Sequence, residues 1–352
     1  MGNLSRALLI WGLGLGLGVM AASSAEEVRV VTVHEFPREV QRTRDVRWLD
    51  DTTLLLASPA QGIVEWSLKE GGYKSWIAAG DNSRSLLWAP SRLGASGRFG
   101  VTSAGIYYVA WWPQENPSNL HSQDFAYAVD LDVQGDQLIV LGARREGMEF
   151  APDGVIAWRT TLAGDSLELK PAFYSTDGPH VRRMNDCACL DTGAVRFFRD
   201  GSYVLVPGVE PGIYLYNDQG TLIRTWDTQA LGIDADCRME EEQALQISAE
   251  PELRIQWLSN HVVVEEVLDL GGKIALILRQ EQEGTIHWSL MTLGLDGSHR
   301  IIPLPVTSKT PGMRLDGDAR GGRLAVVLHN PYRMEGPFED VPRLMILETA
   351  GS

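Results

Sequence analysis

Polar side chains that stand immediately before predicted β-strands are the residues of this chain best suited to bind a ligand. They are Asp45, Arg84, Asp124, Asn185, Asp186, Asn260 and His261. Carboxylate and amide oxygens that converge on one point can hold Ca²⁺ or a small polar molecule. If the predicted strands surround a central channel, these side chains would lie at its top. The simpler interpretation, which the sequence favours, is that Asn and Asp before a strand only make turns. The set is our candidate ligand site, with turns as its alternative.

The three cysteines indicate a disulfide. Cys187 and Cys189 stand two residues apart at the start of a predicted strand, and Cys237 lies in a long downstream loop. In an oxidising compartment we expect Cys237 to pair with Cys187 or Cys189 and to hold that loop on the scaffold. The alternative is a zinc site completed by Asp236 or His180, although the sequence has neither a Cys-x-x-Cys pair nor a His pair at ligand spacing.

No recognisable catalytic motif occurs in the sequence. The 7 histidines never adopt the i, i+4 spacing of a zinc-protease helix. Ser96 lies in Gly94-Ala95-Ser96-Gly97, which is close to a nucleophile elbow. This stretch falls in a predicted hairpin turn, however, and not between a strand and a helix. We therefore predict no catalytic residue and interpret Ser96 as part of a turn.

The composition is that of an ordinary folded protein with an acidic surface. The 352 residues include 31 Lys and Arg against 46 Asp and Glu, which gives a formal net charge of -15. With 22% charged residues and 3 cysteines, the chain is neither a disordered acidic tail nor a disulfide scaffold. Because phosphate recognition depends on Lys and Arg, we expect no nucleic-acid partner.

Residues 1–25 are predicted to be a secretory signal peptide. Arg6 supplies the positive charge, 7–20 the apolar stretch and Ser23-Ser24-Ala25 the small-residue cleavage site. The apolar stretch is shorter than the roughly 20 residues that span a bilayer. We therefore expect a secreted or periplasmic protein with no membrane attachment after cleavage. The alternative is an uncleaved anchor.

A two-residue turn signal followed by a β-rich run occurs six times along the rest of the chain. Each copy is typical of a tight hairpin. The turns lie at 50–51, 96–97, 135–136, 200–201, 271–272 and 321–322, and the runs before them at 46–49, 86–88, 126–133, 194–198, 262–270 and 313–315. Further strands begin at Gly62, Gly105, Gly154, Gly212 and Gly284, with last runs at 74–77, 166–169, 221–226 and 300–304. Most copies therefore hold four short strands.

Repetition of a four-stranded unit predicts an all-β fold, a six-bladed β-propeller over residues 26–352 as one domain. The last copy lacks an outer strand, whereas the β-rich run 28–33 belongs to no copy. We expect run 28–33 to complete the last blade and close the ring. Trp66, Trp158 and Trp288 occupy equivalent positions, so we expect them to pack between blades. A two-sheet sandwich would not explain the repeated order.

The fourth copy contains Phe198-Arg199-Asp200-Gly201-Ser202-Tyr203-Val204-Leu205, then Gly212-Ile213-Tyr214-Leu215-Tyr216 and Gly220-Thr221-Leu222. This order resembles one repeat of the six-bladed NHL/TolB-like propellers. The resemblance implies a fold and not an activity, since such propellers include binding modules, receptors and hydrolases. In the lactonase-like hydrolases of this form, a calcium site is flanked by a catalytic carboxylate or His. This chain lacks their Pro-Asn-Gly run and early acidic signature.

Long loops are predicted to gather on one side of the ring. Second-to-third-strand loops and blade-to-blade connections share one side, which we call the top face. First-to-second and third-to-fourth connections share the bottom face. The long loops assigned to the top face are 143–153, 329–340, 113–123, 171–186 and the insertion 227–260, in which we expect one or two helical turns at 240–245. Elaborated loops on a rigid scaffold are where binding concentrates, although surface decoration is the alternative.

These observations favour a secreted, monomeric propeller that binds a protein or small ligand through its top face, with neither catalysis nor a cofactor. Long one-sided loops and the lack of a catalytic motif carry this expectation. The alternative is a Ca²⁺-dependent, lactonase- or esterase-like hydrolase with a site at the top of the central channel. A bound calcium would favour that alternative.

Overall fold

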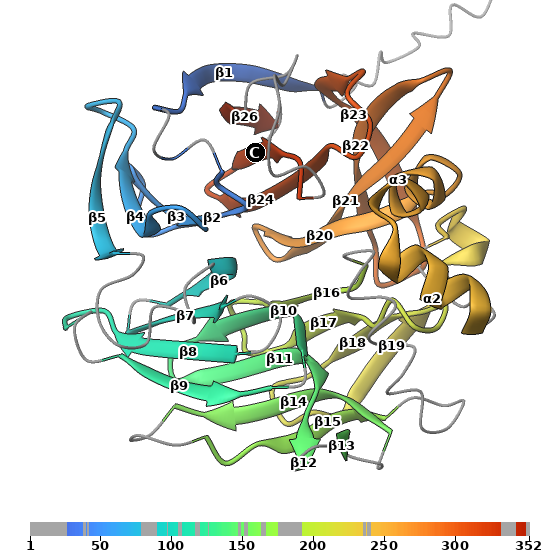
Figure 1. The fold of residues 1–352 in the computed structure, drawn as a ribbon, viewed down its shortest axis with the longest axis horizontal. Coiled ribbons are helices and arrows are strands. Elements are labelled where there is room, and N and C mark those ends of the chain that lie inside the picture. Colours follow the sequence, from blue (N-terminus) through green and yellow to red (C-terminus); the bar gives the residue numbers. More distant parts are fainter. Residues whose placement is uncertain are drawn as a thin grey trace, which may run out of the picture.

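Six four-stranded antiparallel sheets stand around a common axis in the computed structural model of the protein (Figure 1). The structure describes residues 27–349 except 38–39, 41, 79–89, 97, 105–107, 117–119, 126, 147–148, 151–153, 163–166, 175–191, 235–236, 238–240 and 332–342. The predicted signal peptide, residues 1–25, lies outside the described residues. The chain passes from each sheet to the next around the ring, so the expected six-bladed β-propeller is confirmed.

Each blade contains four strands, ordered from the channel outward. Blade one contains β2 (Asp45–Trp48), β3 (Thr53–Ser58), β4 (Gly62–Ser67) and β5 (Gly72–Ala78); blade two β6 (Pro90–Ala95), β7 (Phe99–Ala104), β8 (Tyr108–Pro113) and β9 (His121–Asp124). Blade three contains β10 (Tyr127–Gln134), β11 (Gln137–Ala143), β14 (Val155–Thr161) and β15 (Lys170–Tyr174); blade four β16 (Ala194–Phe197), β17 (Tyr203–Val206), β18 (Ile213–Tyr216) and β19 (Leu222–Trp226). Blade five contains β20 (Val263–Leu270), β21 (Lys273–Gln282), β22 (Thr285–Leu293) and β23 (His299–Ser308); blade six β24 (Arg314–Arg320), β25 (Arg323–His329), β26 (Arg343–Thr349) and β1 (Val28–Glu35). A short ribbon of β12 (Arg145–Glu146) and β13 (Glu149–Phe150) extends the β11–β14 connection.

The hairpins form where the turn residues predict them. All six predicted turns connect the inner strand of a blade to its second strand. Between β20 and β21, Gly271 and Gly272 have φ of 65° and 87°. Two consecutive left-handed residues match the twist of the flanking strands, and glycine adopts this conformation without a steric penalty.

Blade six is completed by a strand from the opposite end of the chain. β1 pairs antiparallel with β26, from Val28 opposite Thr349 to Glu35 opposite Arg343. The expectation that run 28–33 closes the ring is therefore confirmed. Backbone hydrogen bonds between β1 and β26 therefore close the ring. Figure 1 shows the two strands side by side.

Blade two departs from its predicted strands. Its inner strand begins at Pro90, whereas the predicted run 86–88 lies outside the described residues. Its outer strand, β9, escapes sequence prediction because His-Ser-Gln-Asp has no β-rich pattern. The connection 113–121 therefore joins a third strand to a fourth and lies on the bottom face. The prediction that placed loop 113–123 on the top face was wrong.

Apolar packing between neighbouring blades forms the core. Trp66, Trp158 and Trp288 are 1%, 3% and 1% exposed, and each belongs to a buried cluster that includes side chains of an adjacent blade. Trp288, for example, shares a cluster with Leu315 of blade six. The expected packing of these three residues between blades is confirmed.

The insertion between blades four and five is more helical than predicted. It contains a short 3-10 helix, η3 (Gln229–Leu231), and two nine-residue helices, α2 (Glu241–Ala249) and α3 (Pro251–Ser259). Pro251 is favourable at the first position of α3 because its missing N–H would have no partner there. None of the helices in the described part of the chain is long and apolar enough to cross a membrane.

Blade four and blade five both anchor the insertion. Cys237 is 2% exposed, and its backbone N–H donates to Gly208 O at 2.6 Å. From blade five, Arg279 Nη1 donates to Leu258 O at 2.7 Å. α2 and α3 are therefore held on the scaffold rather than tethered loosely to it.

We predict that removal of β1 destabilises the whole ring. A chain beginning at Phe36 leaves the edge of β26 unpaired and exposes its apolar neighbours, so its melting temperature should fall by about 10 °C or more. Differential scanning calorimetry measures the change. As a control, Arg29→Ala removes only the exposed ion pair to Glu348 and should change the melting temperature little. Equal stability of the truncated and full chains would contradict the role of β1.

Candidate functional site

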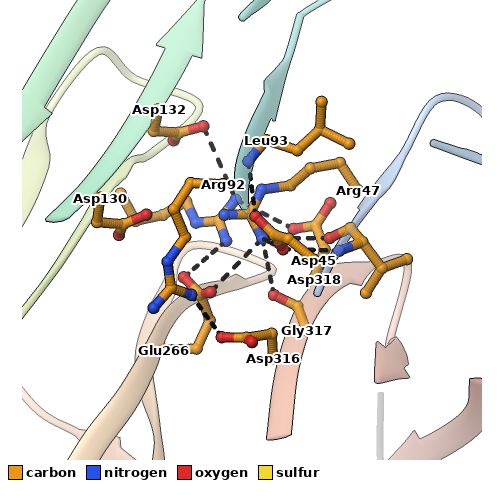
Figure 2. Close-up of polar contacts among 12 residues, drawn as sticks. Asp45, Arg47, Arg92, Leu93, Asp130, Asp132, Glu266, Asp316, Gly317 and Asp318 are labelled. Carbon is orange, nitrogen blue, oxygen red and sulfur yellow. Dashed lines mark hydrogen bonds and ion pairs between the residues drawn. The ribbon is translucent and has the colours of Figure 1, made fainter. Parts of the chain in front are cut away.

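Charged side chains of the inner strands fill the central channel (Figure 2). We call the following residues the channel network: Asp45, Arg47, Arg92, Asp130, Asp132, Arg196, Glu266, Asp316 and Asp318. All of them except Asp318 are at most 5% exposed. Isolated charges are very costly to bury, so the stability of the channel depends on how completely these groups pair.

Carboxylates bridge neighbouring blades by accepting backbone N–H groups from the next inner strand. The pairs are Leu93 N to Asp45 (2.7 Å), Val195 N to Asp130 and Phe197 N to Asp132 (both 2.8 Å), Leu315 N to Glu265 (2.6 Å) and Trp48 N to Asp318 (2.8 Å). An inner strand has no further strand on its channel side, so these N–H groups would otherwise be buried without an acceptor. Hydrogen bonds to an ionised acceptor are also stronger than neutral ones.

Two arginines connect several of these acids at once. Arg47 Nη1 lies 3.1 Å from Asp45 Oδ1 and 3.6 Å from Glu266 Oε2, and it donates to Gly317 O at 3.0 Å. Arg196 Nη2 donates to Glu266 Oε1 at 3.1 Å. Nε and Nη2 of Arg47 have no hydrogen-bond partner among the described residues. The channel charges are thus largely committed to one another.

Burial dominates the protonation of the acids. It raises the pKa of Asp45 to about 7, against the opposing effect of Arg47. It also raises the pKa of Asp130, Asp132 and Glu265, and that of Glu266 well above its ordinary value. At Asp316, by contrast, Arg92 and His329 outweigh burial and hold the pKa of the carboxyl below its ordinary value. Burial therefore disfavours the ionised form of most of these acids, and the neighbouring arginines oppose that effect.

Asp316 also forms a pair with His329. His329 Nε2 hydrogen-bonds to Asp316 Oδ2, and Arg92 Nη1 lies 2.5 Å from Asp316 Oδ1. His329 Nδ1 has no hydrogen-bond partner among the described residues. An imidazole oriented by a carboxylate with its other nitrogen free has the form of a general base, but this side chain is only 5% exposed.

One opening into the channel lies on the bottom face. A cavity of about 190 Å³ there is lined by Arg47, Asp132, Arg196, Asp318 and Arg320, among other residues. Ligand pockets usually have volumes of about 300–1,000 Å³. This opening therefore suits water or a very small polar molecule.

The structure does not bring together the predicted ligand residues that it describes. Asp45 lies in the channel network and is 0% exposed. Asp124 ends β9, the outermost strand of its blade, and is exposed, which is a correction to its expected place beside the channel. Asn260 and His261 follow α3 in the insertion. The remaining members, Arg84, Asn185 and Asp186, lie outside the described residues.

The sequence does contain a signal for the channel network. Charged residues alternate with uncharged ones inside the inner strands, as in Asp130-Leu131-Asp132 and Asp316-Gly317-Asp318. Because successive residues of a strand point to opposite sides, such pairs share one side of the sheet. We chose the predicted ligand residues from polar positions that precede the strands. The charged residues of the channel network lie inside the strands instead.

Asn260 and His261 instead line a groove between α2 and α3. The groove has a volume of about 290 Å³ and is completed by Gln243, Gln246, Gln256, Ile247, Leu253 and Trp257. The His261 ring stacks on Trp257 with centroids 4.0 Å apart. His261 Nδ1 lies 2.6 Å from Trp257 O, and since a carbonyl only accepts, Nδ1 carries the proton. In the neutral ring, Nε2 is then a hydrogen-bond acceptor.

The described side chains by themselves do not form a metal site. Among the described residues, no group of three or more His, Cys, Asp and Glu side chains is arranged to hold a metal ion. The carboxylate expected to bind Ca²⁺, Asp45, accepts hydrogen bonds from Val46 N, Leu93 N and Arg47. Cys237 is not a free thiol. Cys187, Cys189, His180 and Asp236 lie outside the described residues.

Comparison with known proteins supports the fold alone. No family model and no curated protein matches the chain. A solved structure of a DUF4221 family member from Bacteroides vulgatus has a TM-score of 0.52 at 9% identity, covering 92% of this chain and 98% of its own. Streptogramin B lyase has a TM-score of 0.49 at 6% identity (92% and 98% covered), and the WD40 β-propeller domain of Doa1 one of 0.44 at 11% identity (91% and 97% covered). The chain is a six-bladed β-propeller.

We predict that the protein becomes less stable as the pH rises from 5 to 8. Folding raises the pKa of Asp45 from 3.8 to about 7, so the folded state binds a proton that the unfolded state releases. The stabilisation by that proton is present at low pH and is lost as the pH rises through 7. The melting temperature should fall by about 5 °C over this range.

Asp45→Asn should weaken this pH dependence, because the amide does not titrate. Asp51→Asn is the matched control, since the Asp51 side chain is 79% exposed and paired with Arg320 at the surface. It should leave the slope of melting temperature against pH unchanged. A wild-type melting temperature that is constant or rises between pH 5 and 8 would contradict proton uptake by the channel.

Proposed function

We propose that the protein is a secreted, monomeric, non-catalytic propeller that binds a neutral, hydroxyl-rich ligand, such as one sugar unit of an oligosaccharide, in the α2–α3 groove. The signal-like sequence at 1–25 supports export. The repeat in blade four supports assignment of the ring to the NHL/TolB-like type. The single observation that carries the proposal is the groove itself, with its four amide side chains and its indole–imidazole stack.

The lining of the groove favours a polar ligand without charge. Gln243, Gln246, Gln256 and Asn260 carry amide groups, which both donate and accept and so match the mixed character of hydroxyl groups. Asn260 Nδ2 already donates one hydrogen bond, to Gln256 O at 3.0 Å. His261 Nε2 adds an acceptor. None of the lining residues is Asp, Glu, Lys or Arg, so the groove offers no permanent charge to a charged ligand.

The position of the groove also supports binding. It belongs to the insertion between blades four and five, which follows an outer strand and precedes an inner one, and so lies on the top face. Ile247, Trp257 and Leu258 pack into the blade-four core, and Ser259 Oγ donates to Glu281 Oε2 at 2.6 Å. A groove on anchored helices can keep its polar groups in place before the ligand arrives.

A hydrolase is the second candidate function, favoured by the pair of Asp316 and His329. That pair supplies a carboxylate-oriented imidazole, which a general base requires. Two observations argue against a hydrolase. The His329 side chain is only 5% exposed, and the neighbouring charged groups already form ion pairs with one another. The described carboxylates do not fit the calcium-dependent form of this function.

We also propose that the insertion is held by a disulfide from Cys237 to Cys187 or Cys189. Cys237 is buried and not free, and the only other cysteines of the chain are these two. Peptide mapping of protein exported to an oxidising compartment, without reduction, should yield a peptide that contains Cys237 linked to one containing 187 and 189. Recovery of three free thiols would exclude the disulfide.

A screen against neutral oligosaccharides tests the groove. The tightest binder on a glycan array should lose affinity by at least about tenfold, or roughly 1.4 kcal/mol, in Gln256→Ala and in His261→Ala, because each variant removes a hydrogen-bonding group. Titration calorimetry measures the affinities. Gln229→Ala, an exposed glutamine of the same insertion outside the groove, is the matched control and should bind within about twofold of wild type.

Two outcomes would contradict the proposal. One is an array on which no neutral glycan binds, or on which binding does not respond to the groove variants. The other is turnover of p-nitrophenyl acetate or γ-butyrolactone that His329→Asn abolishes, or that disappears when a stoichiometric calcium is removed. The second outcome would establish the hydrolase instead.

A further inference from the structure

A larger pocket lies on the bottom face, away from the groove. Its volume is about 620 Å³, and it is formed by the lower ends of blade three and the β18–β19 turn of blade four. The lining includes Arg159, Glu168, Lys170, Tyr203 and Asp218. Pockets of this size accommodate organic ligands. The proposed function makes no use of it.

The Arg159 guanidinium is held in one orientation at the wall of this pocket. Its Nη2 donates to Asp218 O at 3.0 Å. Its Cζ lies 5.0 Å from the centre of the Tyr203 ring and 6.0 Å from that of Phe197. A guanidinium fixed by a carbonyl on one side and aromatic rings on the other loses little freedom when it binds a further acceptor.

Tyr203 supplies a buried hydroxyl next to that cation. The residue is 1% exposed, and its ring stacks on Tyr216 at 4.9 Å. The hydroxyl lies beside Arg159 but makes no hydrogen bond of good geometry with any described residue. Burial raises the pKa of Tyr203, so the hydroxyl keeps its proton and can donate it. A buried donor without an acceptor is costly, and a ligand oxygen would remove that cost.

At Gly220 the β18–β19 turn passes close to both donors. A Cβ placed on Gly220 would lie 3.5 Å from Arg159 Nη1 and 3.8 Å from Tyr203 Oη. These two donors therefore face the same space, and a carboxylate there would accept from both. Charge-assisted bonds from a guanidinium to a carboxylate are among the strongest in proteins.

The other charged groups of the pocket favour a ligand that carries both signs. Glu168 and Asp218 are exposed carboxylates of the lining, and Lys170 is an exposed cation. We infer that this pocket binds a zwitterion of short-peptide size, with its carboxylate at Arg159 and Tyr203 and its ammonium group at Glu168 or Asp218. A simple anion would leave the two acids opposed to it, and a simple cation would leave Arg159 and Tyr203 unused.

Trialanine and its capped forms test this inference. Titration followed by saturation-transfer difference NMR should show saturable binding of trialanine to the full mature protein. N-acetylation and C-amidation should each weaken binding at least tenfold, because each removes one charge. Arg159→Gln should weaken it at least tenfold and Tyr203→Phe at least fivefold.

Tyr216→Phe is the matched control, since that ring stacks on Tyr203 but Tyr216 is not among the lining residues. It should change trialanine binding less than twofold. Gln256→Ala and His261→Ala should also leave it unchanged, which separates this site from the proposed groove. Melting curves verify that Arg159→Gln and Tyr203→Phe are folded.

Three results would overturn the inference. The first is no saturable binding of trialanine to wild type. The second is equal affinity for the free and capped peptides, which would indicate contact without charge recognition. The third is a loss of binding on C-amidation alone, which would make the ligand a simple organic anion.

Discussion

The fold depends on acceptors for backbone N–H groups at the inner edges of its blades. A sheet has two edges, and in this ring the inner edge of each blade faces a channel that is filled with buried side chains. Asp45, Asp130, Asp132, Glu265 and Asp318 supply acceptors to N–H groups of the next blade. Each such bond satisfies a buried donor and also fixes the angle between two blades. The network therefore acts on the ring geometry and not only on its stability.

This constraint determines where a ligand can bind. The charged groups at the centre already bind one another and the backbone, so a ligand that displaced them would expose buried charges. A ligand can therefore bind more readily at surfaces whose polar groups do not already form ion pairs with one another. The α2–α3 groove on the insertion and the bottom-face pocket between blades three and four meet that condition.

Local signals in the sequence predicted the ring but not the channel. Turn pairs such as Gly271-Gly272 determine hairpins over a few residues. The run 28–33 belonged to no repeat, and the last repeat lacked an outer strand, so the two could be matched from the sequence. Asp124 was misplaced because β9, with the sequence His-Ser-Gln-Asp, is held by its neighbour rather than by its own β propensity. The partners of the channel acids come from other blades, as when Asp318 binds Trp48, and no local pattern encodes such pairs.

The closure of the ring by β1 and β26 has a consequence for synthesis. Arg29 and Glu348, which pair across these strands, are 319 positions apart in the chain. At a translation rate of roughly 5–20 residues per second, β1 waits about 15 to 60 s before its partner exists. During that interval Val30, Val31 and Val33, which remain 40–48% exposed even in the finished ring, belong to an unpaired strand. Until blade six has been made, β1 is thus an unpaired strand with exposed valines, the kind of edge that can pair with another strand.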